Sequence, residues 1–556
     1  MPPSESHGTW QNGYSHANRA TANEPTTHAS SKGQPINGSS NTYVNGTNDF
    51  IDAHLNGTNG FTEPSDFAIS ASSGANVNGT NRFSGARANG TNGSSSPRIE
   101  SNGFSNTDIA ICGIGVRLPG RIRSPSDLFD FLVNKGDARS VVPEDRYNVE
   151  AFFGPPDKPG TLMTKYGYYL DLDLSKFDAS MFRMSNAEIA TVDPSQRLLL
   201  EVTREAFESA GETDFRGRNI GTFVGNFTED WQDLQNVDLL NFAPYQMIGK
   251  SDFALSNRLA YEYDLLGPSV SVKTACSATA QAVHAAILAI HNRSCPSAIV
   301  AGANVIITPR TSISMSALGL LAPDGNCKTF DADANGFARG ESVCAMYLKP
   351  LQDAIRDGNP IRAVIRACDS NADGGDGSRT FGTPNAVAQE ALIRQTYASA
   401  GLNLADTKIV ELHGTGTVVG DPLETAAIAQ CFGGDEKVYI GSVKPNLGHG
   451  EGGSALTSIL KTVVALENKT ILPNIKFEKP NPKSKSHVIV RWERLMPFSV
   501  RWDRNLHVPV DPLPWPEQTC ERISINSFGL GGSNVHVSSL KTCLAFATHS
   551  NSIDGP

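Results

Sequence analysis

An apolar strand passes directly into a small-residue helix in the stretch Pro268-Ser-Val-Ser-Val-Lys-Thr-Ala-Cys-Ser-Ala-Thr-Ala280, and Cys276 stands at the junction. The Val and Ser residues predict a strand ending near Val272, and the small residues after it predict a helix that begins at Cys276. Backbone amides and the positive end of the helix dipole favour a thiolate over a thiol at such a position. The junction therefore predicts that Cys276 is a nucleophile able to take up an acyl group.

The composition is that of a large soluble enzyme, with 556 residues of which 39% are hydrophobic and 19% charged. A net charge of −10, without any long run of Lys or Arg, argues against a nucleic-acid binder. The first twenty residues lack the apolar segment of a signal peptide, and no stretch is apolar enough for a membrane span. Nine cysteines without a C-x-x-C pair suggest neither disulfides nor bound metal. We therefore expect a cytoplasmic protein.

Three regions differ in composition. Residues 1–107 are rich in Asn, Gly, Ser and Thr and are predicted to form a disordered leader, while residues 539–556 are predicted to form a short tail. Between them, from about 108 to 538, short apolar runs alternate with helical patterns, which indicates an α/β body with buried sheets. A second strand-like entry near Arg362 predicts two halves, about 108–357 and 358–538.

Two histidines follow apolar strands and lie in glycine-rich loops, His413 in His-Gly-Thr-Gly-Thr417 and His449 in Lys444-Pro-Asn-Leu-Gly-His. Glycine lets the backbone approach a ligand closely. A solvated loop histidine is the ordinary alternative for either one, but two in the same setting favour a functional role over packing. The sequence therefore pairs Cys276 with two candidate partners.

Two glycine patterns resemble dinucleotide-binding loops, but both fail on spacing. After Gly113-Ile-Gly115 the third glycine is replaced by Leu118, and after Gly414-Thr-Gly416 the next glycine, Gly420, comes one residue too late. We therefore expect no nicotinamide cofactor.

Seven motifs occur in a fixed order: Val192-Asp-Pro-Ser-Gln-Arg-Leu-Leu-Leu-Glu201, Thr274-Ala-Cys-Ser277, Lys328-Thr-Phe-Asp331, Gly336-Phe-Ala-Arg-Gly-Glu341, His413-Gly-Thr-Gly-Thr417, Lys444-Pro-Asn-Leu-Gly-His449 and Asn526-Ser-Phe-Gly-Leu-Gly-Gly-Ser-Asn534. Together they resemble the β-ketoacyl synthase (ketosynthase) domain of fungal iterative, highly reducing type I polyketide synthases. The resemblance covers about residues 108–538. So many motifs in one order make a chance match negligible.

The resemblance implies a thiolase-type fold, in which two similar α/β halves form a five-layered αβαβα core, usually as a homodimer. It also implies roles. Cys276 would receive an acyl chain from the phosphopantetheine of an acyl-carrier protein, and no cofactor would be bound to the chain itself. His413 and His449 would hold a malonyl thioester while carbon dioxide leaves, as neutral N–H donors to the enolate. The enolate would then attack the acyl group on Cys276.

The resemblance also implies supporting residues. Lys444 and Glu451 would order the site electrostatically, although a surface ion pair is the alternative for Lys444. The amides of Cys276 and Leu530 would form an oxyanion hole, and Phe528 and Asn534 belong to the same glycine-rich motif.

Some positions depart from the family pattern. Lys273 stands where an acidic residue is common, Ala278-Thr279-Ala280 replaces a more usual Ser-Ser-Leu, and Leu530 replaces Phe at a gating position. These departures put the pocket shape and the rate in doubt. Val490-Arg-Trp-Glu-Arg494 recurs as Val500-Arg-Trp-Asp-Arg504, a duplication for which the sequence suggests no role.

The chain extends only about twenty residues beyond the last motif, so we expect it to be a free-standing or truncated ketosynthase that takes its carrier protein in trans. A basic loop is one candidate docking site for an acidic carrier, although an ordinary solvated loop fits the pattern better; it comprises Lys476, Lys479, Lys483 and Lys485. The expected product class is a polyketide secondary metabolite, including mycotoxins. Two alternatives stay open, namely a catalytically silent dimerising partner and a non-decarboxylative acyltransferase.

Overall fold

The computed structural model describes residues 107–540 except 156, 239, 241, 376, 378, 485–487 and 490–504. The predicted leader up to residue 106, the predicted tail from residue 541 and the duplicated segment therefore lie outside the described residues. Within the described part of the chain, no helix combines the length and apolar character that a membrane crossing requires.

The central sheet contains one strand pattern twice. The first copy has the order β1 (Ile109–Arg117), β7 (Ser342–Pro350), β6 (Ser297–Asn304), β4 (Ile220–Gly225) and β5 (Ser269–Val272). The second has the order β8 (Ala363–Ala372), β16 (Ser533–Leu540), β15 (Arg522–Phe528), β9 (Ile409–Glu411) and β10 (Val438–Gly441). In each copy the first two pairings are antiparallel and the next two parallel. The two predicted halves thus share one topology.

The two half-sheets are joined by a short antiparallel pairing between β1 and β8. The second half is extended by β13 (Leu506–His507) and β12 (Val488–Ile489). Strand β16 ends at Leu540, two residues beyond the expected end of the globular body.

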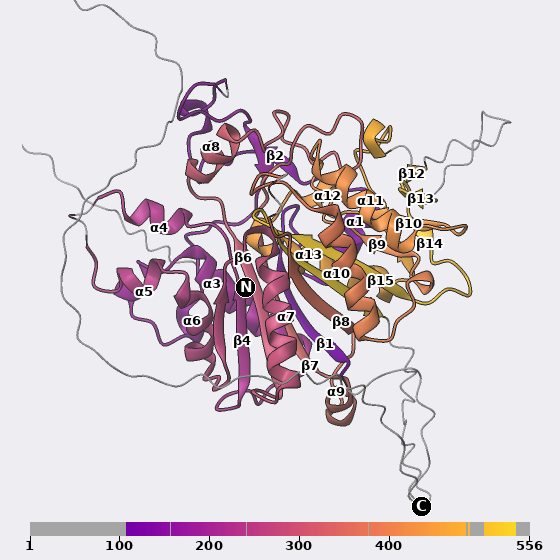
Figure 1. Ribbon diagram of the computed structural model, residues 1–556. Helices are drawn as coiled ribbons and strands as arrows, with labels where there is room; N and C mark the ends of the chain where they lie inside the picture. The colour runs from indigo at the N-terminus through magenta and orange to yellow at the C-terminus, as the bar shows by residue number, and fades with distance from the viewer. Residues whose placement is uncertain are drawn as a thin grey trace, which may run out of the picture. The chain divides into compact units, whose positions relative to one another are not determined.

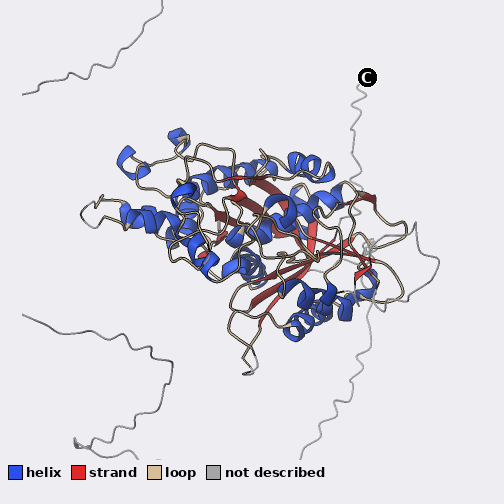
Figure 2. Ribbon diagram, turned by 90° about the horizontal axis from the view of Figure 1, so that it is seen from above, coloured by secondary structure: helices blue, strands red, loops and turns tan. Residues whose placement is uncertain are grey.

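Helices on both faces of each half-sheet give five layers. The outer helices are α3 (Pro194–Ser209) and α6 (Phe253–Tyr263) on the first half, and α10 (Ala386–Ser399) and α11 (Gly420–Phe432) on the second. The central layer holds α7 (Ala278–His291) and α13 (Ser454–Glu467), which contact each other and strands of both halves. In Figure 1, α7 lies between β4 and β8. Figure 2 shows the strands inside, with helices around them.

The sequence of the central helices suits their position between two sheets. In α13 every residue from Ser454 to Leu466 is buried, as expected for a helix without a solvent face. In α7 the start is small because the sheet comes very close: a Cβ atom on Gly302 of β6 would lie 2.1 Å from Thr279 Cγ2. Glycines in the strands and small residues in the helix together bring the start of α7 against the sheet.

The strand expected before Cys276 is confirmed as β5, but the helix begins two residues later than predicted. A 3₁₀ turn, η3 (Ala275–Ser277), precedes α7, and Ala275 has a φ of 53°. This left-handed residue separates the strand from the helix and turns the chain sharply. Cys276 therefore lies in a turn in front of α7.

The remaining elements surround this core. They are α1 (Pro125–Val133), β2 (Arg139–Val141), η1 (Val149–Ala151), β3 (Tyr166–Tyr168), η2 (Ala179–Met181), α2 (Asn186–Ile189), α4 (Asp230–Gln235), α5 (Gln246–Lys250), α8 (Arg310–Ala317), α9 (Leu351–Asp357), η4 (Leu404–Asp406), α12 (Lys444–Leu447), η5 (Glu451–Gly453), β11 (Thr470–Ile471), η6 (Pro482–Ser484) and β14 (Leu513–Pro514).

Candidate active site

Cys276, His413 and His449 each follow the carboxyl end of a strand in the parallel part of a half-sheet. Cys276 follows β5, His413 follows β9, and His449 follows β10 and the short helix α12. Strands β5 and β10 are the fifth strands of the two half-sheets, so the thiol and His449 come from equivalent places. The duplicated topology thus brings together three residues that lie far apart in the sequence.

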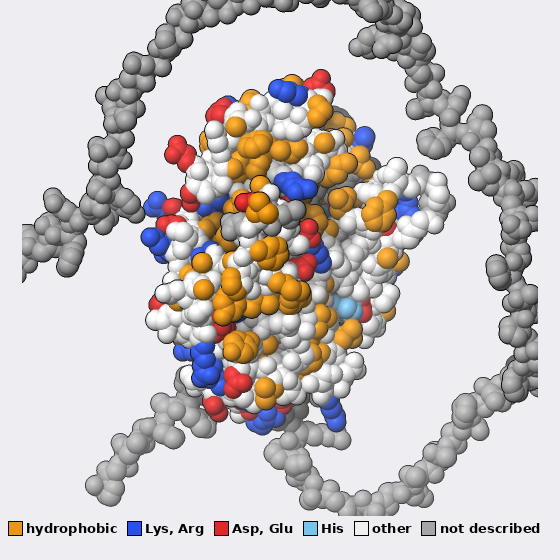
Figure 3. All heavy atoms as spheres, turned by 90° about the vertical axis from the view of Figure 1, so that its left-hand side faces the viewer, with side chains coloured by type: hydrophobic (Ala, Val, Ile, Leu, Met, Phe, Trp, Pro, Cys, Tyr) orange, Lys and Arg blue, Asp and Glu red, His pale blue; other side chains and the backbone are white. Residues whose placement is uncertain are grey.

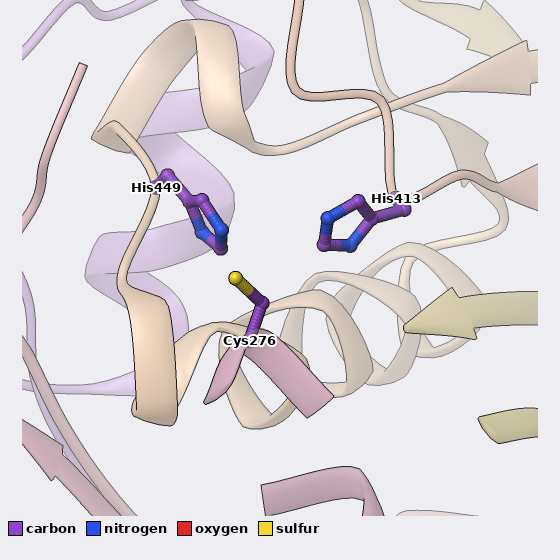
Figure 4. A group of neighbouring side chains, drawn as sticks. All are labelled: Cys276, His413 and His449. Atoms are coloured by element: carbon purple, nitrogen blue, oxygen red, sulfur yellow. The ribbon is translucent and has the colours of Figure 1, made fainter. Parts of the chain in front are cut away.

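The three side chains converge on one point. The Cys276 Sγ atom and one ring nitrogen of each histidine lie within 4.8 Å of one another. The two imidazole rings are 5.4 Å apart between centroids and nearly perpendicular, at 87°. Figure 4 shows the thiol of Cys276 directed toward the two rings. All three residues line a cavity of about 300 Å³.

Backbone amides determine which nitrogen of each imidazole carries the proton. The N–H of Glu451 donates to His449 Nδ1 at 3.2 Å, and the N–H of Phe528 donates to His413 Nδ1 at 3.4 Å. An Nδ1 that accepts a hydrogen bond is unprotonated, so in the neutral rings Nε2 carries the hydrogen. The Nε2 of His449 is buried and has no partner among the described residues. Both histidines thus offer an N–H donor, and a protonated Nε2 does not ligate a metal.

The pKa values of both histidines lie well below the ordinary value of histidine. Burial is the main cause for each, and the nearby charge of Lys444 adds to it. Lys444 is 1% exposed and makes no ion pair among the described residues. Burial lowers the pKa of Lys444, while Glu411 and Glu424 act in the opposite direction. The site therefore holds neutral imidazoles beside a buried cation.

Lys444 and Glu451, predicted to order the site electrostatically, both act on the pKa of the Cys276 thiol, but their side chains do not pair with each other. Glu451 binds Arg339 instead, with Arg339 Nε on Glu451 Oε1 and Arg339 Nη2 on Glu451 Oε2 at 3.0 Å. Arg339 also donates to Ser312 Oγ at 2.7 Å. A guanidinium matches a carboxylate in two places, which a lysine ammonium does not. Arg339 was quoted within a motif but given no role, although a buried arginine requires such a partner.

The expectation of a pKa favouring the Cys276 thiolate is also wrong for this structure. Burial raises the pKa of the Cys276 thiol to about 11, and the charge of Glu451 adds to this. The backbone N–H of Leu530 and that of Cys276 itself face the sulfur and act in the opposite direction. These are the two amides predicted to form an oxyanion hole, and their effect on the thiol pKa does not outweigh that of burial.

The loop of His413 is held by Glu424, a residue to which the sequence analysis assigns no role. The N–H of His413 donates to Glu424 Oε1 at 2.7 Å and the N–H of Gly414 to Oε2 at 2.9 Å. Asn526 Nδ2 also donates to Glu424 Oε1, at 2.8 Å. Burial raises the pKa of Glu424 to about 7. Glu424 thus positions the backbone of His413, and a glutamate eleven residues later gave no local signal of this.

The supporting residues of the glycine-rich motif lie in the cavity wall. Phe528 contributes its N–H to His413, and Leu530 is 46% exposed beside the cavity. Asn534 is buried, and its Nδ2 donates to Asp373 Oδ1 at 2.7 Å and to Asn371 Oδ1 at 3.2 Å. Each therefore lies near the three central side chains.

The structure accounts for two of the departures from the family pattern. Lys273 pairs with Glu229 and, at 3.1 Å, with Asp252, so the cation is compensated by two carboxylates. Ala278-Thr279-Ala280 is fully buried against the glycines of β4 and β6, where larger side chains have no room. Both features tie the Cys276 turn to its surroundings.

The basic loop is only partly available to a partner. Lys476 lies over Tyr168, pairs with Asp137 at 2.9 Å, and its side chain is 17% exposed. Lys479 and Lys483 are exposed, while Lys485 lies outside the described residues. Lys476 thus makes contacts within the fold, and its charge is already paired with Asp137.

Known proteins resemble this chain in both halves. The family model "Beta-ketoacyl synthase, N-terminal domain" matches residues 106–354, and "Beta-ketoacyl synthase, C-terminal domain" matches residues 362–478. A squalestatin hexaketide synthase of Phoma sp. is 67% identical over 430 residues, which is 77% of this chain and 16% of that protein. The highly reducing polyketide synthase VdtX of Byssochlamys spectabilis is 53% identical over 432 residues, or 77% of this chain and 19% of that protein.

Solved structures agree with these matches. A ketosynthase from module 6 of the bacillaene synthase of Bacillus subtilis 168 is 30% identical with a TM-score of 0.67, covering 78% of this chain and 72% of that one. The thiolase-type fold expected from the sequence is thereby confirmed. The chain spans only about a sixth of the length of the curated relatives named above. The duplicated sheet, the converging thiol and histidines, and these matches place the chain in the β-ketoacyl synthase family.

Proposed function

We propose that this chain catalyses the decarboxylative Claisen condensation of a malonyl thioester with an acyl chain held on Cys276, in polyketide biosynthesis. One observation carries the proposal most directly: two neutral imidazoles present Nε2–H donors beside a thiol in one cavity. A thiol alone would suit any acyl transfer. Two N–H donors beside it suit a reaction in which negative charge develops on a carbonyl oxygen.

The first step loads the enzyme. The Cys276 sulfur attacks the thioester carbonyl of an acyl group on a phosphopantetheine arm, and the arm leaves as a thiol that takes the proton of Cys276. The exchange of one thioester for another is nearly balanced in energy. Because the pKa of the Cys276 thiol is raised to about 11, the thiol is protonated at rest, and its proton must leave as the sulfur attacks.

The second step makes the carbon nucleophile. The malonyl thioester loses its carboxylate as carbon dioxide, and the electron pair of the broken bond passes to the thioester oxygen as an enolate. In the proposal, the Nε2–H groups of His413 and His449 donate to this oxygen. Their lowered pKa values keep them neutral, so they stabilise the charge as hydrogen-bond donors.

The third step forms the carbon–carbon bond. The enolate carbon attacks the thioester carbonyl on Cys276, and the amides of Cys276 and Leu530 are placed to donate to the resulting oxyanion. The carbon–sulfur bond then breaks and releases a β-ketoacyl thioester, lengthened by two carbons, on the carrier. The Cys276 thiolate recovers a proton from solvent.

Two measurements test this proposal. Intact-mass analysis after incubation with an acyl-carrier thioester should show an acyl adduct on the native chain and none on Cys276→Ala. Cys520→Ala is a matched control, since Cys520 is the other described cysteine that is partly exposed. An adduct that persists in Cys276→Ala would contradict the assignment of the nucleophile, and no adduct on the native chain would favour a catalytically silent partner.

Release of carbon dioxide from a malonyl thioester tests the histidines. We expect His413→Ala and His449→Ala each to lower the rate by about 100-fold or more, the usual cost of removing a donor to a developing oxyanion. His507→Ala, in the peripheral strand β13, should leave the rate unchanged. Release that is unaffected by both site changes would favour a non-decarboxylative acyltransferase.

We also propose that the chain works as a homodimer. Figure 3 shows apolar side chains gathered on the face that carries α4, α5 and α6. Exposed residues in this region include Leu240 at 95%, Phe242 at 72% and Met247 at 67%. Strand β5 ends the order of the described sheet nearby, with Val270 exposed. A free strand edge beside an apolar face supports self-association. Sedimentation should show a dimer for the native chain. For Val270→Lys it should show a larger share of monomer at the same concentration.

The proposed setting is the cytoplasm, where a thiol nucleophile stays reduced. The proposed partner is a phosphopantetheine-bearing carrier protein, acting in trans or as part of a longer polyketide synthase. A secondary metabolite, including a mycotoxin, is the product class that this assignment supports.

A further inference from the structure

The cavity beside Cys276 is lined by two chemically different groups of side chains. Phe227, Met315, Leu320 and Phe337 belong to one apolar cluster. Asp373, Gln389 and Asn534 contribute polar groups to the same cavity. An acyl chain gains by contact with apolar side chains. These three polar side chains gain nothing from contact with an acyl chain, so their presence in the cavity requires another explanation.

Two of these polar side chains, Asp373 and Asn534, form hydrogen bonds with each other and with neighbouring residues. Asn534 donates to Asp373 and to Asn371, and Asn371 Nδ2 donates to the carbonyl of Ala388 at 2.8 Å. Asn385 Nδ2 donates to the carbonyl of Asp373 at 3.0 Å and caps α10. These bonds fix the first turn of α10 beside the cavity.

Gln389, in the same first turns of α10, stands outside this network. Its side chain is 1% exposed, and its Oε1 is buried without a hydrogen-bond partner among the described residues. A buried amide oxygen without a partner is costly, and native structures contain few of them. Because Gln389 lines the cavity, a molecule that enters the cavity can supply the missing donor.

We propose that the Gln389 carboxamide binds an amide of the phosphopantetheine arm, with Oε1 accepting the amide N–H. This inference rests on the proposed function and deepens it. Every substrate of that reaction arrives on an arm with two secondary amides, whereas a hydrocarbon chain carries no donor. A carboxamide also matches a secondary amide in both directions, since its Nε2 can donate to the amide carbonyl.

A series of thiol carriers tests the inference on the full chain. The rate of Cys276 acylation is measured with butanoyl-pantetheine, butanoyl-N-acetylcysteamine and butanoyl ethanethiol ester, which have two amides, one amide and none. We expect Gln389→Met to lower kcat/KM for butanoyl-pantetheine by about tenfold, the equivalent of one ordinary hydrogen bond, and to leave the ethanethiol ester unchanged. The N-acetylcysteamine ester identifies which amide is bound.

Two further variants keep the test decisive. Gln389→Asn withdraws the carboxamide by one methylene and should show the same selective loss even if Gln389→Met is poorly folded. Val387→Ala, at an exposed position of α10, should change nothing. An equal loss with all three carriers would overturn the inference in favour of a structural role. No loss with any carrier would overturn it in favour of a bound water. Failure of the native chain with every carrier would instead overturn the proposed function.

Discussion

Lys273 and Lys444 stand at equivalent ends of the duplicated sheet but in opposite electrostatic settings. Lys273 follows β5 directly, and its partly exposed side chain pairs with Glu229 and Asp252. Lys444 comes three residues after β10, is buried, and makes no ion pair among the described residues. The compensated lysine braces the Cys276 turn. Lys444 adds to the lowering of both histidine pKa values, of which burial is the main cause.

The comparison teaches how a repeated topology acquires an asymmetric site. Both half-sheets deliver a turn to the same cavity, and the charges around the two turns differ. The first half places a thiol near Lys273, whose charge is paired with two carboxylates. The second half places an imidazole beside the buried Lys444 and the Arg339–Glu451 pair. The predictions below probe these differences, beginning with the largest effect.

Glu451→Gln should break a buried charge pair between the two halves, since Arg339 belongs to the first half and Glu451 to the second. Arg339 and Glu451 are 4% and 0% exposed, so removing one charge leaves the other buried without compensation. We expect the free energy of unfolding to fall by about 4 kcal/mol. Denaturant titration of the native chain and the variant measures this. The double change Arg339→Met with Glu451→Gln should recover part of the loss, and a double variant less stable than either single variant would contradict the interpretation.

Lys444→Met should remove the cation while keeping an unbranched side chain that is only one atom shorter. Since the Lys444 charge lowers the histidine pKa values, removing it raises both, although burial still keeps them below the ordinary value. We expect decarboxylation at neutral pH to fall by about 30-fold, the scale of one lost electrostatic contact in a buried site. NMR titration of the histidines checks the direction, and unchanged titration midpoints would refute the role of Lys444.

The reactivity of Cys276 should depend steeply on pH. Its folded pKa of about 11 lies above the ordinary value, so the thiol is protonated at neutral pH and loses its proton only as the pH rises toward that value. We expect alkylation by iodoacetamide to accelerate about tenfold per pH unit between pH 7 and 9, because the thiolate is the reactive form. Mass spectrometry of the labelled peptide follows the rate. A plateau below pH 8 would mean that the amides outweigh burial after all.

Lys273→Met should have the smallest effect of the four. Its carboxylate partners are 40–50% exposed, and ion pairs of this kind contribute about 0.2–1 kcal/mol. We expect a loss of stability within that range and acylation of Cys276 within about threefold of the native rate. The same unfolding and acylation assays measure both, and a loss as large as that of Lys444→Met would remove the distinction between the two lysines.

Sequence reasoning went furthest where the signal is local. The Val–Ser strand before Cys276, the glycine-rich histidine loops and the small start of α7 are short patterns, and the structure confirms the elements they predict. It failed where partners are distant. Arg339 and Glu451 are 112 residues apart, and no local pattern links them.

The sequence by itself determined the residue types that carry the chemistry, the family and the two-half α/β architecture, because these follow from motifs and from local hydrophobic periodicity. Only the tertiary structure decided the protonation of those residues. The raised pKa of Cys276, the Nδ1 bonds that orient both imidazoles and the Gln389 oxygen, which has no partner in the described part of the chain, all depend on burial. Burial is set by elements that meet across the fold, such as the contact between His413 and Phe528, 115 residues apart. Desolvation and hydrogen-bond partners are properties of that packing, and no short stretch of sequence contains them.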